Sequence, residues 1–195
     1  MTGLLTAASV VVTLAAGVLY VRAALQEARP KMVSWLGWTA LLVIGAVSAL
    51  EEGQVPAAVY ILACAAMCAA VVLLVWRRGG WALAWLDRVS LAGVTAGLVL
   101  LAAARSPGWA TGVTVAVDAA AYVPTAVHAW QEPGEEPWPA YALFAAGAGL
   151  SLAAAHVLAF TAVAYPAYLL AADTAVMTVI LARRRRPGLI TRRSP

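Results

Sequence analysis

The sequence predicts an all-α membrane protein with seven transmembrane helices. Of its 195 residues, 64% are hydrophobic and only 11% are charged, whereas a soluble domain of this size carries about 25% charged residues. The apolar residues fall into seven runs, each near the roughly 20 residues that one span requires. When these runs are taken as successive spans, nearly all the basic residues gather on one side of the membrane. So few charges could not cover a solvated surface.

In order along the chain, the seven predicted spans are 3–26, 33–51, 55–76, 85–104, 107–129, 138–157 and 161–182. The first has no basic residues before its apolar run, so we interpret it as a retained helix and not as a cleaved signal peptide. The least distinct boundary lies between the last two spans, because the residues that join them carry no charge.

The distribution of charge predicts the orientation. With seven spans, every one of the 13 basic residues except Arg105 falls on the same side. Basic loops favour the cytoplasmic side, so the sequence predicts an outer N-terminus, a cytoplasmic C-terminus and a multi-pass protein of the cell membrane. The last residues, 184–195, form a basic cytoplasmic tail that we expect to lie against anionic lipid headgroups.

An internal repeat relates the two ends of the chain. A shift of 103 positions places Pro30 on Pro133, Trp35 on Trp138, Trp38 on Tyr141 and Ser48 on Ser151. We therefore expect a first three-helix repeat over 1–80, a linker helix over 81–106 and a second repeat over 107–183. Three helices and a linker make an even number of crossings, so the repeats would be parallel.

This 3+1+3 arrangement, with a proline in the first helix of a repeat, resembles the SWEET/PQ-loop superfamily. Pro124-Thr125 stands at the PQ-loop position, with threonine where the family has glutamine, and the first repeat has Val21-Arg22 there. Tryptophans at the start of a second helix also resemble the nicotinamide riboside transporter group. The resemblance implies a transporter with this topology.

Two carboxylates are the main candidates for a site. Charged side chains inside a bilayer are costly and are functional candidates for that reason. Asp118 lies about midway along the fifth span and Asp173 a little past midway along the seventh, at similar depth. They could exchange protons, coordinate a cation or bind a polar substrate. Alternatively, each could bond a neighbouring hydroxyl, such as Thr114 or Thr174, and only orient the helices.

Prolines and aromatic residues surround these carboxylates in the sequence. Pro124 and Pro166 interrupt the backbone hydrogen bonds of the fifth and seventh spans and could act as hinges or as static kinks. Four aromatic residues lie where helices leave the cytoplasmic interface. They could form a substrate platform or an aromatic belt, and they are Trp35, Trp38, Trp138 and Tyr141.

The turn after the fifth span is acidic. We expect His128 and Trp130 to end this span at the interface, and Glu132, Glu135 and Glu136 to balance the basic residues on that face.

Two functions remain open at this level. The first is a carrier that moves a small polar or aromatic metabolite by alternating access, with its substrate held near Asp118, Asp173 and the four aromatic residues. The second is an integral membrane isoprenoid cyclase. The chain resembles these seven-helix enzymes in Glu51 or Glu52 of the second span and Asp173 of the last, which would act as acid and base.

The expected partners are the lipid bilayer and a small-molecule substrate, with homo-oligomerisation left open. The sequence contains no glycine-rich phosphate loop and no cluster of metal ligands, and its basic residues follow the topology. We therefore expect no cofactor, no metal and no nucleic acid partner.

Overall fold

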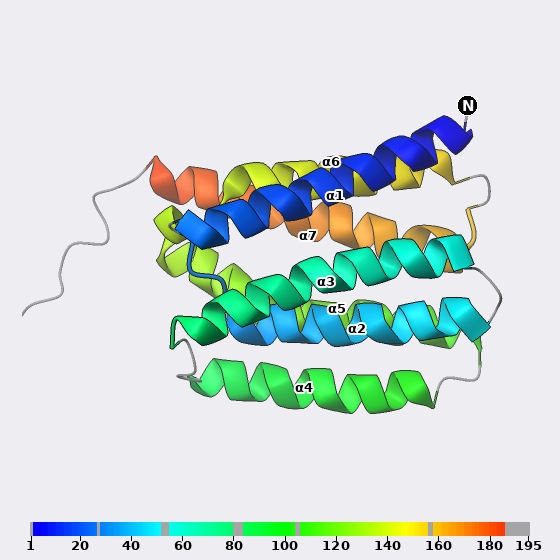
Figure 1. The fold of residues 1–195 in the computed structure, drawn as a ribbon, viewed down its shortest axis with the longest axis horizontal. Helices are drawn as coiled ribbons and strands as arrows, with labels where there is room; N and C mark the ends of the chain where they lie inside the picture. The colour runs from blue at the N-terminus through cyan, green and yellow to red at the C-terminus, as the bar shows by residue number, and fades with distance from the viewer. Residues whose placement is uncertain are drawn as a thin grey trace, which may run out of the picture.

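A computed structural model describes residues 2–26, 28–51, 55–79, 84–103, 106–155 and 158–185. These residues form seven α-helices and one short 3-10 helix, with a shared long axis. In order they are α1 (Thr2–Gln26), α2 (Met32–Glu51), α3 (Val55–Arg77), α4 (Trp85–Ala102), α5 (Pro107–Gln131), η1 (Pro133–Glu135), α6 (Trp138–Ala154) and α7 (Phe160–Arg184). The helices lie side by side, with α1 beginning at one end of the bundle and α7 finishing at the other (Figure 1).

The prediction of seven helices in an all-α fold is confirmed. Three stretches are long and apolar enough to cross a bilayer, namely Gly3–Gln26, Gly108–Gln131 and Ala162–Arg184, and shorter apolar stretches occur in α2, α3 and α6. Together they indicate a multi-pass membrane protein. The sixth helix is shorter than expected, because it ends at Ala154 while the predicted span ran to residue 157.

Local chemistry fixes several helix ends. The Ser106 hydroxyl accepts a hydrogen bond from the Trp109 N–H at 3.3 Å, and Pro107 occupies the first position of α5, where its missing N–H costs nothing. Asp87 similarly accepts the Ala84 N–H at 3.0 Å at the start of α4. After α3, Gly79 has a φ of 75°, a left-handed conformation that glycine adopts without strain.

The helices pack in a regular order. The helix α3 contacts both α1 and α2, and α7 contacts both α5 and α6. The two groups meet where α1 lies along α6 and where α2 lies against α5. The helix α4 lies at the edge of the bundle, against α5 and α2 (Figure 1). The positions of α5 and α7 therefore depend on contacts with several other helices.

The close approach of α4 to α5 leads to a stability prediction. A Cβ atom built on Gly97 would lie 2.1 Å from Cγ2 and 3.3 Å from Cβ of Val117, whereas one on Gly93, a turn earlier, would make only an ordinary contact at 3.7 Å. We expect Gly97→Ala to lower the free energy of unfolding by about 1–3 kcal/mol through overpacking. The control Gly93→Ala should be neutral or stabilising, because alanine favours a helix over glycine. Denaturation of both variants in detergent measures the difference. An equal change in the free energy of unfolding for the two variants would contradict the close approach of Gly97 to Val117.

Candidate functional site

Asp173 lies inside the bundle, where α7 faces α5. Its side chain is buried, and its Oδ1 accepts a short hydrogen bond from the hydroxyl of Tyr122 on α5. The ring of Tyr122 in turn packs against Trp38 of α2, with the ring centroids 5.1 Å apart and the planes at 61°. A carboxylate, a phenol and an indole from three different helices thus meet in one place.

Asp118 connects the same two helices through a different set of hydrogen bonds. It belongs to α5, and its Oδ1 and Oδ2 accept hydrogen bonds from Tyr165 at 3.0 Å and from Tyr168 at 2.8 Å, both on α7. The carboxyl group of Asp118 is buried, as is that of Asp173.

The hydrogen-bond donors to these carboxylates differ from the expected Thr114 and Thr174. They are three tyrosines, Tyr122, Tyr165 and Tyr168. The hydroxyl groups that satisfy each aspartate come from the other helix of the pair, so the bonds join α5 to α7. This role in orienting the two helices is the alternative that the sequence analysis left open, with different donors.

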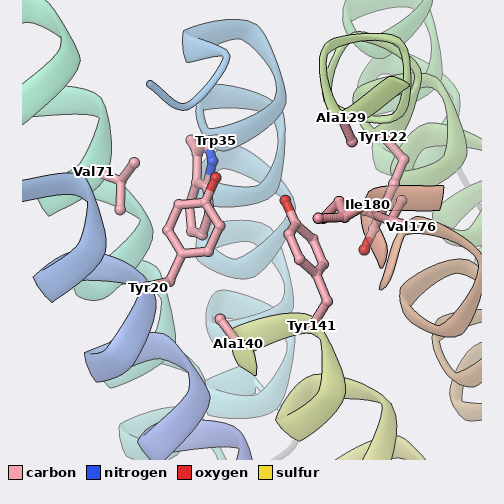
Figure 2. Packing of buried hydrophobic residues seen from close by; sticks show 9 residues of the cluster. All are labelled: Tyr20, Trp35, Val71, Tyr122, Ala129, Ala140, Tyr141, Val176 and Ile180. Carbon is pink, nitrogen blue, oxygen red and sulfur yellow. The ribbon is translucent and has the colours of Figure 1, made fainter. Parts of the chain in front are cut away.

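Aromatic rings connect Asp173 to one end of the bundle. Trp38 packs edge to face on Trp35 at 5.1 Å, and Trp35 lies 4.3 Å from Tyr20 of α1. Tyr20 then meets Tyr141 of α6 at 5.9 Å, nearly at a right angle. Figure 2 shows Tyr20 and Trp35 against each other, with Tyr141 across from them and Tyr122 beside α7.

The structure therefore brings most of the candidate residues into one cluster. Trp35, Trp38 and Tyr141 lie along the line of rings, Trp138 packs against its edge, and Asp173 stands at its inner end. The sequence analysis missed Tyr20 and Tyr122. Tyr122 lies one helical turn after Asp118, which could have drawn attention to it, but nothing near Tyr20 in the sequence marks it as a partner.

Glu136 is a buried acid in the turn between η1 and α6. Its side chain is only 1% exposed, and its Oε2 accepts hydrogen bonds from Tyr20 and Tyr141, both at 2.8 Å. Burial raises the pKa of this carboxyl from 4.5 to about 7, although the two tyrosine hydroxyls and Lys31 act in the opposite direction. The expectation that Glu136 only balances surface charge was wrong, because the turn folds it inward between α1 and α6.

The other acids of this turn agree better with that expectation. Glu135 lies 3.5 Å from the Arg29 guanidinium and 3.4 Å from Nε2 of His128, and Glu132 is exposed. His128 is itself buried near the end of α5, whereas Trp130 is exposed and stacks under the Arg183 guanidinium at 4.7 Å.

A pocket of about 940 Å³ opens at this end of the bundle. Its wall carries both signs of charge, with Arg29, Lys31 and Arg78 beside Asp87 and Glu135. Helix geometry places the aromatic cluster next to it. Ala24 lines the pocket one turn beyond Tyr20, and Val75 lines it one turn beyond the buried Val71. The end of the cluster that holds Tyr20 therefore lies about one helical turn from the pocket lining.

The end of α7 fastens the acidic turn. The Arg184 guanidinium donates to the backbone carbonyls of Pro133 at 2.9 Å, Gly134 at 3.4 Å and Glu136 at 2.9 Å. Arg183 donates to the carbonyl of Trp130 at 3.1 Å. Arginine can satisfy several acceptors at once because its five N–H donors have a fixed geometry. These contacts hold in place the turn that carries Glu136.

The two candidate hinges lie inside continuous helices. Pro124 is fully buried in α5, and Pro166 lies inside α7. Next to Pro124, the hydroxyl of Thr125 donates to that of Ser34 on α2 at 2.8 Å, and both residues are fully buried. Thr125 thus joins α5 to α2.

The structure describes only part of the residues named for the cyclase alternative. Glu52 lies outside the described residues, and only the backbone of Glu51 is described, as the last residue of α2. Comparison of the chain with protein-family models, curated proteins and solved structures finds no match.

Proposed function

We propose that this protein is a small carrier of the cell membrane, which moves a polar or aromatic metabolite by alternating access. The observation that carries the proposal is the pair of buried aspartates at mid-helix, with a line of packed aromatic side chains beside them and an open charged pocket at one end of the bundle. A bilayer protein retains such carboxylates at a cost in stability, and they commonly mark substrate and ion pathways.

The packing order supports two parallel repeats. If α1, α2 and α3 correspond to α5, α6 and α7, every contact within the first group has its counterpart in the second. The contact of α1 with α6 then corresponds to that of α5 with α2. Two bundles related by an axis along the membrane normal, as in parallel-repeat transporters, would give this pattern of contacts, which supports the proposed likeness to the SWEET/PQ-loop superfamily.

In this proposal the pocket is the cytoplasmic vestibule, because Arg29, Lys31 and Arg78 line it and basic residues favour that side. The buried Tyr20 lies one turn beyond its lining residue Ala24. Substrate would enter when the two bundles rock apart, with Pro124 and Pro166 as the points where the backbone bends most easily. Its binding energy would come from Asp173 and the aromatic rings of Tyr122 and Trp38, with Asp118 holding α5 and α7 together.

Uptake by proteoliposomes tests the proposal. The purified protein is reconstituted and offered a pool of labelled metabolites, beside the Asp173→Asn and Asp118→Asn variants and the exposed control Glu132→Gln. We expect a solute to accumulate with wild type and with the control, and accumulation to fall at least about tenfold in Asp173→Asn. If no solute accumulates above protein-free liposomes, and neither aspartate variant changes ligand-dependent thermal stability, the proposal is wrong.

The cyclase is the second candidate, favoured by the contact of Asp173 with Tyr122 beside ring faces that could stabilise a carbocation. A cyclase would convert a linear isoprenoid in detergent solution with no vesicle present. Such conversion, lost in Asp173→Asn, together with no uptake, would establish it in place of the carrier.

A further inference from the structure

We propose that Asp173, Trp38 and Tyr122 form a binding site for an organic cation, an amine or quaternary ammonium with a compact apolar or aromatic body. As an assignment of the cargo, this rests on the proposed carrier function. As an assignment of a binding site, it stands on the geometry of these three side chains.

The charge of Asp173 calls for a cation. Within the described residues, its carboxylate has one hydrogen-bond donor, the neutral hydroxyl of Tyr122. Ion pairs in the described part of the chain involve only Glu135, at the end of the bundle. A carboxylate in a low-dielectric interior is compensated by a positive charge or by a proton. Since the described residues supply no basic side chain at this place, a cationic ligand can take the role that a proton would otherwise fill.

The surrounding rings select an organic cation over a metal ion. The Tyr122 hydroxyl bonds Asp173, and Trp38 packs against the Tyr122 ring with the two planes at 61°, so a phenol and an indole in mutual contact lie on the Tyr122 side of this carboxylate. The face of an aromatic ring is negative and attracts ammonium groups, tryptophan most strongly. A quaternary ammonium needs no hydrogen-bond acceptor, so a carboxylate and ring faces are sufficient for it. A metal ion would require several oxygen or nitrogen ligands in place of rings.

Asp118 is the weaker candidate for the same role. Tyrosine hydroxyls of α7 occupy both of its oxygens, whereas the bond from Tyr122 occupies only Oδ1 of Asp173. A ligand at Asp173 therefore has one donor to displace and an adjacent oxygen to bind. We assign ligand binding to Asp173, and to Asp118 the joining of α5 to α7.

Benzyltrimethylammonium is the probe, because it combines a quaternary ammonium with an aromatic ring. Binding to the purified full-length protein in detergent is measured by calorimetric titration and by thermal shift. The comparison ligands at equal ionic strength are benzenesulfonate, an aromatic anion, and sodium chloride. We expect the ammonium compound alone to bind and to raise the melting temperature. Stabilisation by benzenesulfonate equal to that by the cation would overturn the proposal.

Variants locate the site. Asp173→Asn should weaken binding at least about 30-fold, because it removes the charge that pairs with the ligand. Trp38→Leu should weaken it roughly 2- to 30-fold, while the exposed control Trp109→Leu should not. Tyr122→Phe keeps the ring and removes the competing hydroxyl, so binding should be retained or tighter. The Trp38 and Tyr122 variants decide the question even if Asp173→Asn fails to fold. Unchanged affinity in Trp38→Leu would contradict the site.

Binding and uptake together distinguish a failure of the cation site from a failure of the carrier function. If the cation binds as expected but is not taken up by proteoliposomes, the site stands and the carrier function falls. If an uncharged or anionic solute is taken up in a manner that depends on Asp173 while the cation does not bind, the carrier stands and the cation site falls.

Discussion

Replacing Glu136 with glutamine is expected to remove most of the loss of stability that the protein shows as the pH rises from about 4.5 to about 7. Burial raises the pKa of this carboxyl to about 7, so the folded protein binds the proton more tightly than the unfolded chain does. Its contribution to stability is fully present below about pH 4.5 and is lost as the pH rises through about 7. The loss amounts to about 3 kcal/mol.

The groups that face Glu136 come from every element packed around it. They are Tyr20 of α1, Tyr141 of α6, Glu135 of η1, Lys31 before α2 and Arg184 of α7, which bonds the Glu136 backbone carbonyl. Within the described residues, Oε1 of Glu136 has no hydrogen-bond partner. A proton on this carboxyl therefore removes an unpaired charge from the interior without breaking the two bonds at Oε2.

The measurement is detergent-solubilised unfolding from pH 4 to pH 8, followed by circular dichroism, for wild type, Glu136→Gln and Glu135→Gln. The neighbouring Glu135 is the matched control, because it is partly exposed and pairs with Arg29. Glu136→Gln should reduce the change in the free energy of unfolding across this pH range. Glu135→Gln should leave that change as it is in wild type. Equal pH profiles for wild type and Glu136→Gln would show that this carboxyl is not a buried titrating group.

Asp118→Ala is expected to destabilise the protein by about 2–5 kcal/mol. The substitution removes the acceptor of two tyrosine hydroxyls, Tyr165 and Tyr168, and leaves them in a largely buried place. A buried polar group without a partner costs about 1–3 kcal/mol. Because both tyrosines belong to α7, the loss acts on the α5–α7 contact that positions Asp173.

A combined variant tests this cause. Tyr165→Phe together with Tyr168→Phe removes the two hydroxyls, so adding Asp118→Ala to them should cost less than Asp118→Ala costs in wild type. Non-additivity of this kind measures the interaction directly. Thr114→Val is the control and should change stability by less than about 0.5 kcal/mol. Additive effects would mean that the tyrosines do not bond Asp118.

The sequence predicts the helices of this fold well, because length and apolar composition are sufficient to identify a span. Ser106 and Pro107 mark the start of α5 in the sequence as they do in the structure. The order in which the helices pack is much harder to predict. Lipid is as apolar as a neighbouring helix, so the residues of α1 that meet α6 look no different from those that meet lipid.

For the candidate site, too, the sequence shows which residues are unusual but does not show which residues they contact. Asp118 and Asp173 stand out as acids in apolar runs, and the structure buries both. Tyr165 and Tyr168, three residues apart, could be seen to share a face of one helix, but no local pattern tells which helix they meet. Glu136 was misjudged because a glutamate among prolines and glycine in a short acidic turn usually lies in water.

The bonds of Arg184 to the turn before α6 have a consequence for the biogenesis of the protein. The turn is synthesised about 50 residues before the guanidinium that satisfies its carbonyls. The side chain of Glu136 can meet Tyr20 and Tyr141 before α7 is made, because both tyrosines belong to α1 and α6. A chain released before α7, in contrast, would leave three backbone carbonyls of this turn without the guanidinium that they bond in the finished protein.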